Sequence, residues 1–219
     1  MIKAFFVDFY GTLVHENGRI VKKISDIISD SGCGADSSEI DSYWGKDFKN
    51  MFRESYGSSF VTQRKIEKRS IKHTLEKFHS DEDASSLSEM LFEEWGKPEI
   101  YEDSKSFLEQ SPIPVYILSN IDNEDIRSAL DYHSIKTAGV FTSEDAKAYK
   151  PRREIFEYAL EQTGLMPNEV IHIGDSIGAD VTGASSLNIR ALWLNRNGRE
   201  TPNRVKSISS LNEALTYIK

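Results

Sequence analysis

The sequence contains very little cysteine, no long apolar run and no excess of basic residues. Its 219 residues include one cysteine, Cys33, so no disulfide can form within the chain and no cysteine pair can hold zinc. No stretch approaches the roughly 20 consecutive apolar residues that a membrane span needs. The apolar opening is interrupted by Asp8 and is too short for a signal-peptide core. We therefore expect a cytoplasmic protein without a membrane partner.

Acidic residues outnumber basic ones, since 27 lysines and arginines face 35 aspartates and glutamates and leave a formal net charge of −8. Nucleic-acid-binding proteins usually present a basic face to phosphates, so this balance argues against a nucleic-acid partner. Hydrophobic residues make up 38% and charged residues 28% of the chain, which is typical of a globular protein. The sequence leaves both a monomer and a homodimer open.

Four short apolar runs have the composition of buried parallel strands. They lie at residues 4–7, 115–118, 170–173 and 191–194. Helices are predicted over residues 154–163, between Pro151 and Gly164, and over the closing segment 207–218. This alternation predicts an α/β fold, a doubly wound parallel sheet of Rossmann type with helices on both faces.

Residues 16–98 lack strand-like runs and carry aromatic and aliphatic residues at helical spacing, for which core packing is the ordinary role. The acidic run 81–83 is expected to be a solvated loop between two of these helices. We predict a helical cap over 16–98, inserted into a core made of 1–15 and 99–219.

Polar residues follow three of the four predicted strands. The carboxyl ends of parallel strands meet at one edge of the sheet, where ligands bind in open α/β folds. The candidate residues at this edge are Asp8, Ser119, Asn120, Asp175 and Asp180, together with Lys150, which precedes a helix.

These residue types fit phosphoryl transfer. An aspartate such as Asp8 can act as a nucleophile and form an aspartyl-phosphate, provided that cations and hydrogen-bond donors offset the charge of the transferred group. Lys150 and Mg²⁺ would supply the charge, and Ser119 a donor. Mg²⁺ prefers carboxylate and carbonyl oxygens, and Asp8 and Asp175 offer carboxylates. Asp180 would bind the ion directly or contact a residue that does. We expect a small anionic substrate.

Four segments, taken together, resemble the motifs of the haloacid dehalogenase-like hydrolase superfamily. Residues 5–13 have the order Phe-Phe-Val-Asp-Phe-Tyr-Gly-Thr-Leu, close to the family's strand followed by Asp-x-Asp-Gly-Thr. Ser119-Asn120 ends a strand, Lys150-Pro151 precedes a helix, and residues 174–180 match Gly-Asp-Ser-x3-Asp. The inserted helices lie where members with a helical cap carry it.

The resemblance implies a role for each matching residue. The catalytic residues would be Asp8, Tyr10 and Lys150. The substrate-binding residues would be Gly11, Thr12, Ser119 and Asn120, of which Gly11 also lets the chain turn sharply after Asp8. The ligands of Mg²⁺ would be Asp8, the backbone carbonyl of Tyr10, Asp175 and Asp180.

Tyr10 departs from the phosphatase pattern. Phosphatases of the family carry a second aspartate there as general acid and base, and a phenol with a pKa near 10 is a poor base at neutral pH. The metal-independent dehalogenating members carry a tyrosine there, but they also carry an arginine early in the cap, usually beside a tryptophan. Here Gly45 and Lys46 follow Trp44, and both Asp175 and Asp180 are kept.

Three functions therefore stay open: a Mg²⁺-dependent phosphohydrolase, which we favour, a 2-haloacid dehalogenase, and a binding or regulatory protein with little turnover. At single residues, ordinary structural roles also compete with the functional ones. Tyr10 could be a packed ring, Ser119-Asn120 a helix cap, and Lys150 part of a solvated basic face beside Lys147. His172, inside a predicted strand, is expected to be buried and hydrogen-bonded rather than catalytic.

Overall fold

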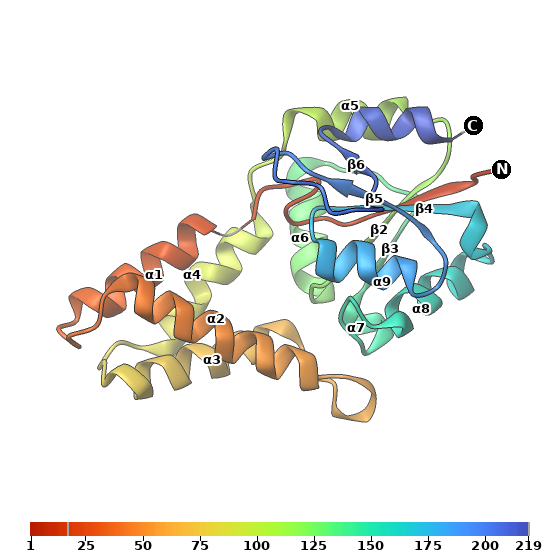
Figure 1. The fold of residues 1–219 in the computed structure, drawn as a ribbon. Helices are drawn as coiled ribbons and strands as arrows, with labels where there is room; N and C mark the ends of the chain where they lie inside the picture. Colours follow the sequence, from red (N-terminus) through yellow and green to blue (C-terminus); the bar gives the residue numbers. More distant parts are fainter. Residues whose placement is uncertain (17, 219) are drawn as a thin grey trace. The chain divides into compact units, whose positions relative to one another are not determined.

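The computed structural model describes residues 1–16 and 18–218, which belong to two compact units (Figure 1). The core unit comprises Met1–Glu16, Glu99–Asn120 and His133–Lys219, and the insertion unit comprises Asn17–Pro98 and Ile121–Tyr132. Helix α6 (Asn123–His133) thus groups largely with the insertion by its contacts. The division made from the sequence, which gave all of 99–219 to the core, stays a prediction.

The core unit is built on a parallel sheet, which in the described residues has six strands in the order β3-β2-β1-β4-β5-β6. All four predicted runs are strands. They are β1 (Ala4–Val7), β2 (Val115–Ser119), β4 (Val170–Gly174) and β5 (Arg190–Leu194). Every residue of β1 and β4 is buried, as expected for strands covered on both faces.

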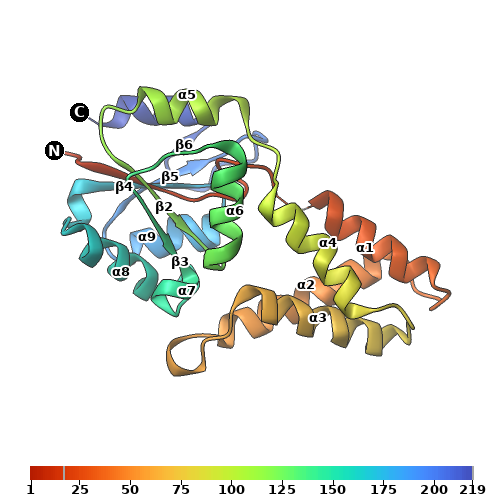
Figure 2. The ribbon, with the colours of Figure 1, turned by 180° about the vertical axis from the view of Figure 1, so that it is seen from behind.

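Helices cover both faces of this sheet, which confirms the predicted fold class. One face carries α7 (Ser143–Ala146), α8 (Arg153–Thr163) and α9 (Thr182–Ser185), and the other carries α5 (Glu102–Gln110) and the 3₁₀ segment η4 (Leu211–Tyr217), as Figures 1 and 2 show. The helix predicted over 154–163 is α8, and it ends at Gly164 in the left-handed conformation. Two short helical segments, η2 (Pro167–Glu169) and η3 (Ile177–Val181), flank β4.

Two edge strands were not predicted, and one of them corrects the closing helix. β3 is Gly139–Thr142, and β6 is Ser207–Ile208. The helix predicted over 207–218 is therefore wrong at its start. Ser207 pairs with Trp193 of β5, and the helical part begins only at Leu211, after Ser209 has bound the Glu213 carboxylate with both its backbone N–H and its hydroxyl.

The insertion unit is helical, as the spacing of its apolar residues predicts. Besides most of α6, it contains the helices α1 (Gly18–Asp30), α2 (Ser37–Glu54), α3 (Gln63–Phe78) and α4 (Ala84–Gly96), with a short 3₁₀ turn η1 (Gly57–Ser59). Residues 81–83 form an exposed loop, and Asp83 caps α4 through a hydrogen bond from the Ser86 N–H. In the described parts of the chain, no helix is long and apolar enough to cross a membrane.

Candidate active site

Asp8 lies at the carboxyl end of β1, where the chain turns back on itself. Its backbone N–H donates to the Ile173 carbonyl of β4 at 2.9 Å, and the Phe9 carbonyl accepts from the N–H groups of Leu13 and Val14. This tight loop brings the Thr12 hydroxyl to 3.3 Å from Asp8 Oδ2. Only 6% of Asp8 is exposed, so burial raises the pKa of its carboxyl, while the Lys150 charge opposes the rise.

Lys150 lies between two carboxylates. Its Nζ donates to Asp8 Oδ1 at 2.6 Å and to Asp180 Oδ1 at 2.7 Å, and all three groups are buried. Burial alone would lower the pKa of Lys150, but Asp180 and Asp8 outweigh it and raise that pKa to about 12. Lys150 is therefore a fixed cation beside the candidate nucleophile, and the alternative of a solvated basic face is wrong.

Asn120 holds the backbone that carries Lys150. Its side-chain Oδ1 accepts from the Lys150 N–H at 2.7 Å, and its Nδ2 donates to the Lys150 carbonyl at 3.1 Å. Both ends of the amide are therefore engaged in positioning Lys150. Ser119, the last residue of β2, is buried next to it in the chain. The substrate-binding roles of Gly11, Thr12, Ser119 and Asn120 stay predictions.

Asp180 is the most enclosed of the three acids. Its Oδ1 accepts from Lys150 and pairs with His172 Nε2 at 2.9 Å, and its Oδ2 accepts from the Ser176 N–H at 3.0 Å. Burial opposes ionisation, but Lys150 and His172 keep the pKa of Asp180 well below its usual range. Gly174 is required behind it, since a Cβ there would lie 2.1 Å from Asp180 Cγ. His172 is buried and hydrogen-bonded, as predicted.

Asp175 differs from the other two acids because its carboxylate has no hydrogen bond or ion pair with any described residue. It follows β4 and lies against Gly11, whose φ is +84° and where a Cβ would be 2.7 Å from Asp175 Oδ1. Burial and then the negative charges of Asp8 and Asp180 raise the pKa of Asp175 to about 7. The sharp turn expected at Gly11 is confirmed, and the group that approaches its backbone is Asp175.

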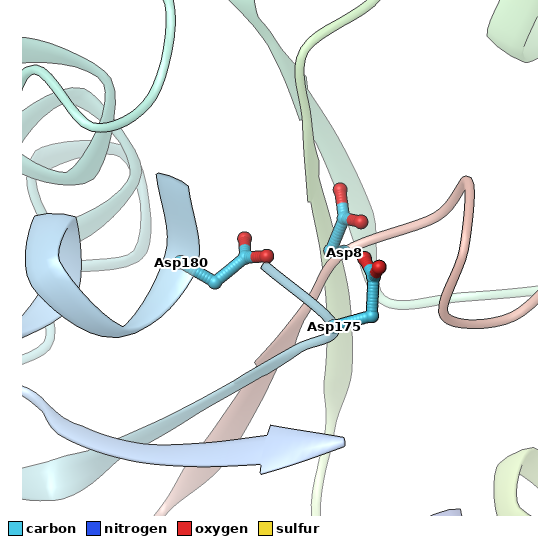
Figure 3. Close-up of side chains that lie close together, drawn as sticks. All are labelled: Asp8, Asp175 and Asp180. Carbon is cyan, nitrogen blue, oxygen red and sulfur yellow. The ribbon is translucent and has the colours of Figure 1, made fainter. Parts of the chain in front are cut away.

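The three aspartates form a set with the right chemistry for a divalent cation. Asp8, Asp175 and Asp180 can each offer an atom such that these atoms lie within 4.8 Å of one another, and Figure 3 shows the carboxyl groups gathered at the ends of β1 and β4. Hard oxygen donors of this kind suit Mg²⁺. Since Asp180 is already engaged by Lys150, His172 and Ser176, Asp8 and Asp175 fit best as direct ligands, with Asp180 behind them.

Tyr10 lies in the loop after β1 and is half-buried. Its ring packs edge-on against Phe9 with the centroids 5.0 Å apart, and its backbone bridges to Val14. This placement agrees with the packed ring that the sequence left open. The role of its carbonyl as a metal ligand, and any catalytic role of its phenol, stay predictions.

The residues that follow β5 belong to the site and were not predicted from the sequence. Arg196 donates to both Asp103 oxygens and to the Thr12 carbonyl at 2.9 Å, and its guanidinium lies 3.9 Å from the centre of the Tyr101 ring. It thus holds the loop that carries Asp8. The criterion of polar residues at strand ends would have found Arg196 had it been applied to the fourth run, 191–194.

Trp193 was also missed. Its Nε1 donates to the Asp175 carbonyl at 2.8 Å, and Arg199 donates to the same carbonyl at 3.2 Å. No sequence signal marks an indole inside a strand as part of a site, because its partner depends on the register of β5 against β4.

The chain is similar to several known proteins. A family model described as haloacid dehalogenase-like hydrolase matches residues 2–188. The chain is 22% identical to (S)-2-haloacid dehalogenase 4A of Burkholderia cepacia over 90% of this chain and 84% of that one. It is 36% identical to pyrimidine 5'-nucleotidase YjjG of Escherichia coli over 32% of this chain and 33% of that one.

A solved structure shares the fold across the whole chain. It is the L-2-haloacid dehalogenase from Xanthobacter autotrophicus, with a TM-score of 0.78 at 18% identity, and the match covers 100% of this chain and 98% of that one. The family model spans most of the sequence, including the loop of Asp8, Lys150 and the three aspartates. The chain therefore belongs to the haloacid dehalogenase-like hydrolases.

Proposed function

We propose that the protein is a Mg²⁺-dependent phosphohydrolase that acts on a small phosphorylated metabolite through a covalent intermediate on Asp8. The observation that carries the proposal is Asp175, a half-buried carboxylate beside Asp8 with a pKa raised to about 7 and no partner among the described residues. Such a group is costly unless a cation accompanies it. In a metal-independent reaction we find no role for the Asp175 carboxylate.

The residues of the site would act in sequence on a phosphate monoester. Asp8 Oδ2, which faces the Thr12 hydroxyl rather than Lys150, attacks phosphorus, so that a new oxygen–phosphorus bond forms while the bond to the leaving oxygen breaks. Lys150 offsets the negative charge on the carboxylate and on the phosphoryl oxygens. Water then attacks phosphorus, which releases phosphate and restores Asp8. Bound Mg²⁺, held by Asp8 and Asp175, would neutralise the charge of the transferred group.

A second function is favoured by Tyr10 and by two relatives that match most of the chain and are named 2-haloacid dehalogenases, whereas the nucleotidase matches a third of it. In that reaction Asp8 would attack the carbon that carries the halogen, halide would leave, and water would hydrolyse the resulting ester. These comparisons support dehalogenation more than phosphate hydrolysis. The Asp175 carboxylate, which pairs with none of the described residues, supports the opposite, and we give the local chemistry greater weight.

One assay separates the two functions. The purified protein is incubated with p-nitrophenyl phosphate or with L-2-chloropropionate, each with Mg²⁺ or with EDTA. Phosphate release that EDTA abolishes is expected. Chloride release that persists in EDTA would replace our proposal with the dehalogenase.

An Asp8→Asn variant serves as the control for the covalent step. It should lower turnover by at least about a thousandfold, because a carboxamide is a far weaker nucleophile than a carboxylate. If Asp8→Asn keeps its activity, Asp8 is not the nucleophile. If the wild type turns over neither substrate, the third function, a binding or regulatory protein with little turnover, is the one left standing.

A further inference from the structure

Trp193 and Arg199 together hold the backbone of Asp175. The register of β4 against β5 places Trp193 opposite Gly174, immediately before Asp175 in the chain. From there the indole Nε1 donates to the Asp175 carbonyl at 2.8 Å. Trp193 is 1% exposed, so its indole N–H is shielded from water and would be left unpaired without this hydrogen bond.

Arg199 covers the outer side of the same contact. Its guanidinium carbon lies 5.0 Å from the centre of the Trp193 ring, and its NH2 group donates to the Asp175 carbonyl at 3.2 Å. The Asn195 side chain fixes Arg199 in turn, since its amide exchanges hydrogen bonds of 2.9 and 2.7 Å with the Arg199 N–H and carbonyl. Asp175 thus has two donors on its carbonyl, and its carboxylate is held by none of the described residues.

We propose that Trp193 is a positioning residue for cation binding by Asp175, with Arg199 as its outer support. This inference rests on the proposed function, because it assigns the cation to the same site. The Asp175 carboxylate lies against Gly11, where a Cβ would be 2.7 Å from its Oδ1, and the backbone that carries this side chain is held by Trp193 and Arg199. Contacts of this kind behind a metal ligand commonly change metal affinity tenfold or more.

The test is calorimetric titration of the full chain with MgCl₂. Trp193→Phe keeps an aromatic ring and removes only the N–H donor, and we expect it to bind Mg²⁺ about tenfold more weakly than the wild type. Trp44→Phe is a matched control, since Trp44 is also buried and donates its Nε1 to Glu67 at 3.2 Å and to Ser70 at 3.0 Å in the insertion unit. It should bind Mg²⁺ as the wild type does.

Arg199→Lys is the second variant, because it keeps the charge and removes the planar group that covers the indole. Arg199 is exposed, so this variant should fold, and we expect a loss of Mg²⁺ affinity below tenfold. A second readout is the Mg²⁺ concentration for half-maximal activity, which should rise in Trp193→Phe while kcat at saturating Mg²⁺ stays unchanged. Circular dichroism identifies any variant that does not fold.

The outcomes are distinct. Unchanged Mg²⁺ affinity in folded Trp193→Phe overturns the inference and leaves the proposed function intact, and if that variant does not fold, unchanged affinity in Arg199→Lys has the same meaning. A wild type that binds no Mg²⁺ overturns the proposed function and the inference with it. Equal losses in Trp193→Phe and Trp44→Phe would mean a general effect of removing a buried indole, and would also overturn the inference.

Discussion

Tyr10 is the residue at which this site departs from the phosphatases of its family, and its placement decides what chemistry remains. The ring packs against Phe9, so the loop after Asp8 is completed by an aromatic contact where phosphatases carry a second carboxylate. In the proposed phosphate hydrolysis, the absence of a carboxyl group at this position would leave protonation of the leaving oxygen and activation of water to solvent or to the phenol. Substrates with good leaving groups should therefore be favoured.

Tyr10→Asp tests this reasoning. The variant restores a carboxyl group beside Asp8, and we expect it to raise hydrolysis of an alkyl phosphate, whose leaving group needs a proton, by at least about a hundredfold relative to the wild type. Hydrolysis of p-nitrophenyl phosphate should change much less. Steady-state rates on the two substrates measure the effect, with Tyr10→Asn as the control of similar size and no acid. Equal behaviour of Asp and Asn at this position would contradict the role assigned to the missing carboxyl.

At the scale of elements, two buried or half-buried acids are accommodated in different ways. One is Asp175, beside the loop that follows β1, and the other is Glu67, on helix α3. The β1 loop approaches Asp175 through Gly11, which has no side chain to block it. Helix α3 instead buries Glu67, which is 7% exposed and accepts hydrogen bonds from Trp44 of α2 and from Ser70. The first arrangement predicts the effect of a side chain at Gly11, and the second predicts how stability depends on pH.

Gly11→Ala should disturb the site as well as the backbone. The positive φ alone costs an alanine about 1 kcal/mol, and the added Cβ would also displace the Asp175 carboxylate, from which it would be 2.7 Å away. Gly34→Ala is the matched control, because its φ is +78° and nothing lies within 4 Å of its Cβ position. Urea unfolding and MgCl₂ titration compare the two. Loss of Mg²⁺ binding in Gly11→Ala alone is expected, and intact binding there would contradict the placement of Asp175.

Glu67 makes stability depend on pH. Burial raises its pKa from 4.5 to about 7, although Trp44 and Ser70 oppose the rise. The folded state therefore favours the neutral acid, and this stabilisation is complete below about pH 4.5 and is lost as the pH rises through about 7. The difference corresponds to about 3 kcal/mol.

Glu67→Gln keeps an acceptor for Trp44 and is neutral at every pH. Its free energy of unfolding, measured in urea, should therefore exceed that of the wild type at pH 8.5 and approach it at pH 5. Glu76→Gln, at an exposed position on the same helix, is the control and should leave the pH profile unchanged. A wild-type stability that is flat between pH 5 and 8.5 would show that Glu67 is not buried as an acid.

At the scale of the whole molecule, Mg²⁺ should act as a stabilising ligand of the core unit. At a concentration ten times its Kd, an ion that binds only the folded state adds about 1.4 kcal/mol to the free energy of unfolding, or roughly 3–5 °C in Tm for a chain of this length.

Asp175→Asn should melt at a higher temperature than the wild type without metal at pH 8, because it removes a carboxylate whose ionisation is opposed by burial and by Asp8. It should also lose the Mg²⁺ response. Scanning calorimetry with and without MgCl₂ measures both effects, and a variant that still responds fully would remove Asp175 from the ligand set.

The sequence predicted the inner strands and the acids that follow them, but it did not predict the edge strands or the contacts that depend on strand register. Strands β1, β2, β4 and β5 lie inside the sheet, and burial on both faces leaves an unbroken apolar run in each. β3 and β6 are the edges, where half-exposed and very short strands carry no such run. Asp8 and Asp175 were found because they follow buried strands. The contacts of Trp193 depend on strand register, which a single sequence does not contain.

The ion pairing of Lys150 has a consequence for ion selectivity. Lys150 is part of the chain and keeps its proton up to about pH 12, so it permanently cancels one of the three aspartate charges. When Asp8, Asp175 and Asp180 are all ionised, these three aspartates and Lys150 sum to a formal charge of −2, before the nearby Glu16 carboxyl is counted. One divalent ion balances that charge, whereas Na⁺ or K⁺ would leave the site repelling an incoming anion. Under the proposed function, the site should therefore favour divalent over monovalent cations, because Lys150 offsets only one of the aspartate charges.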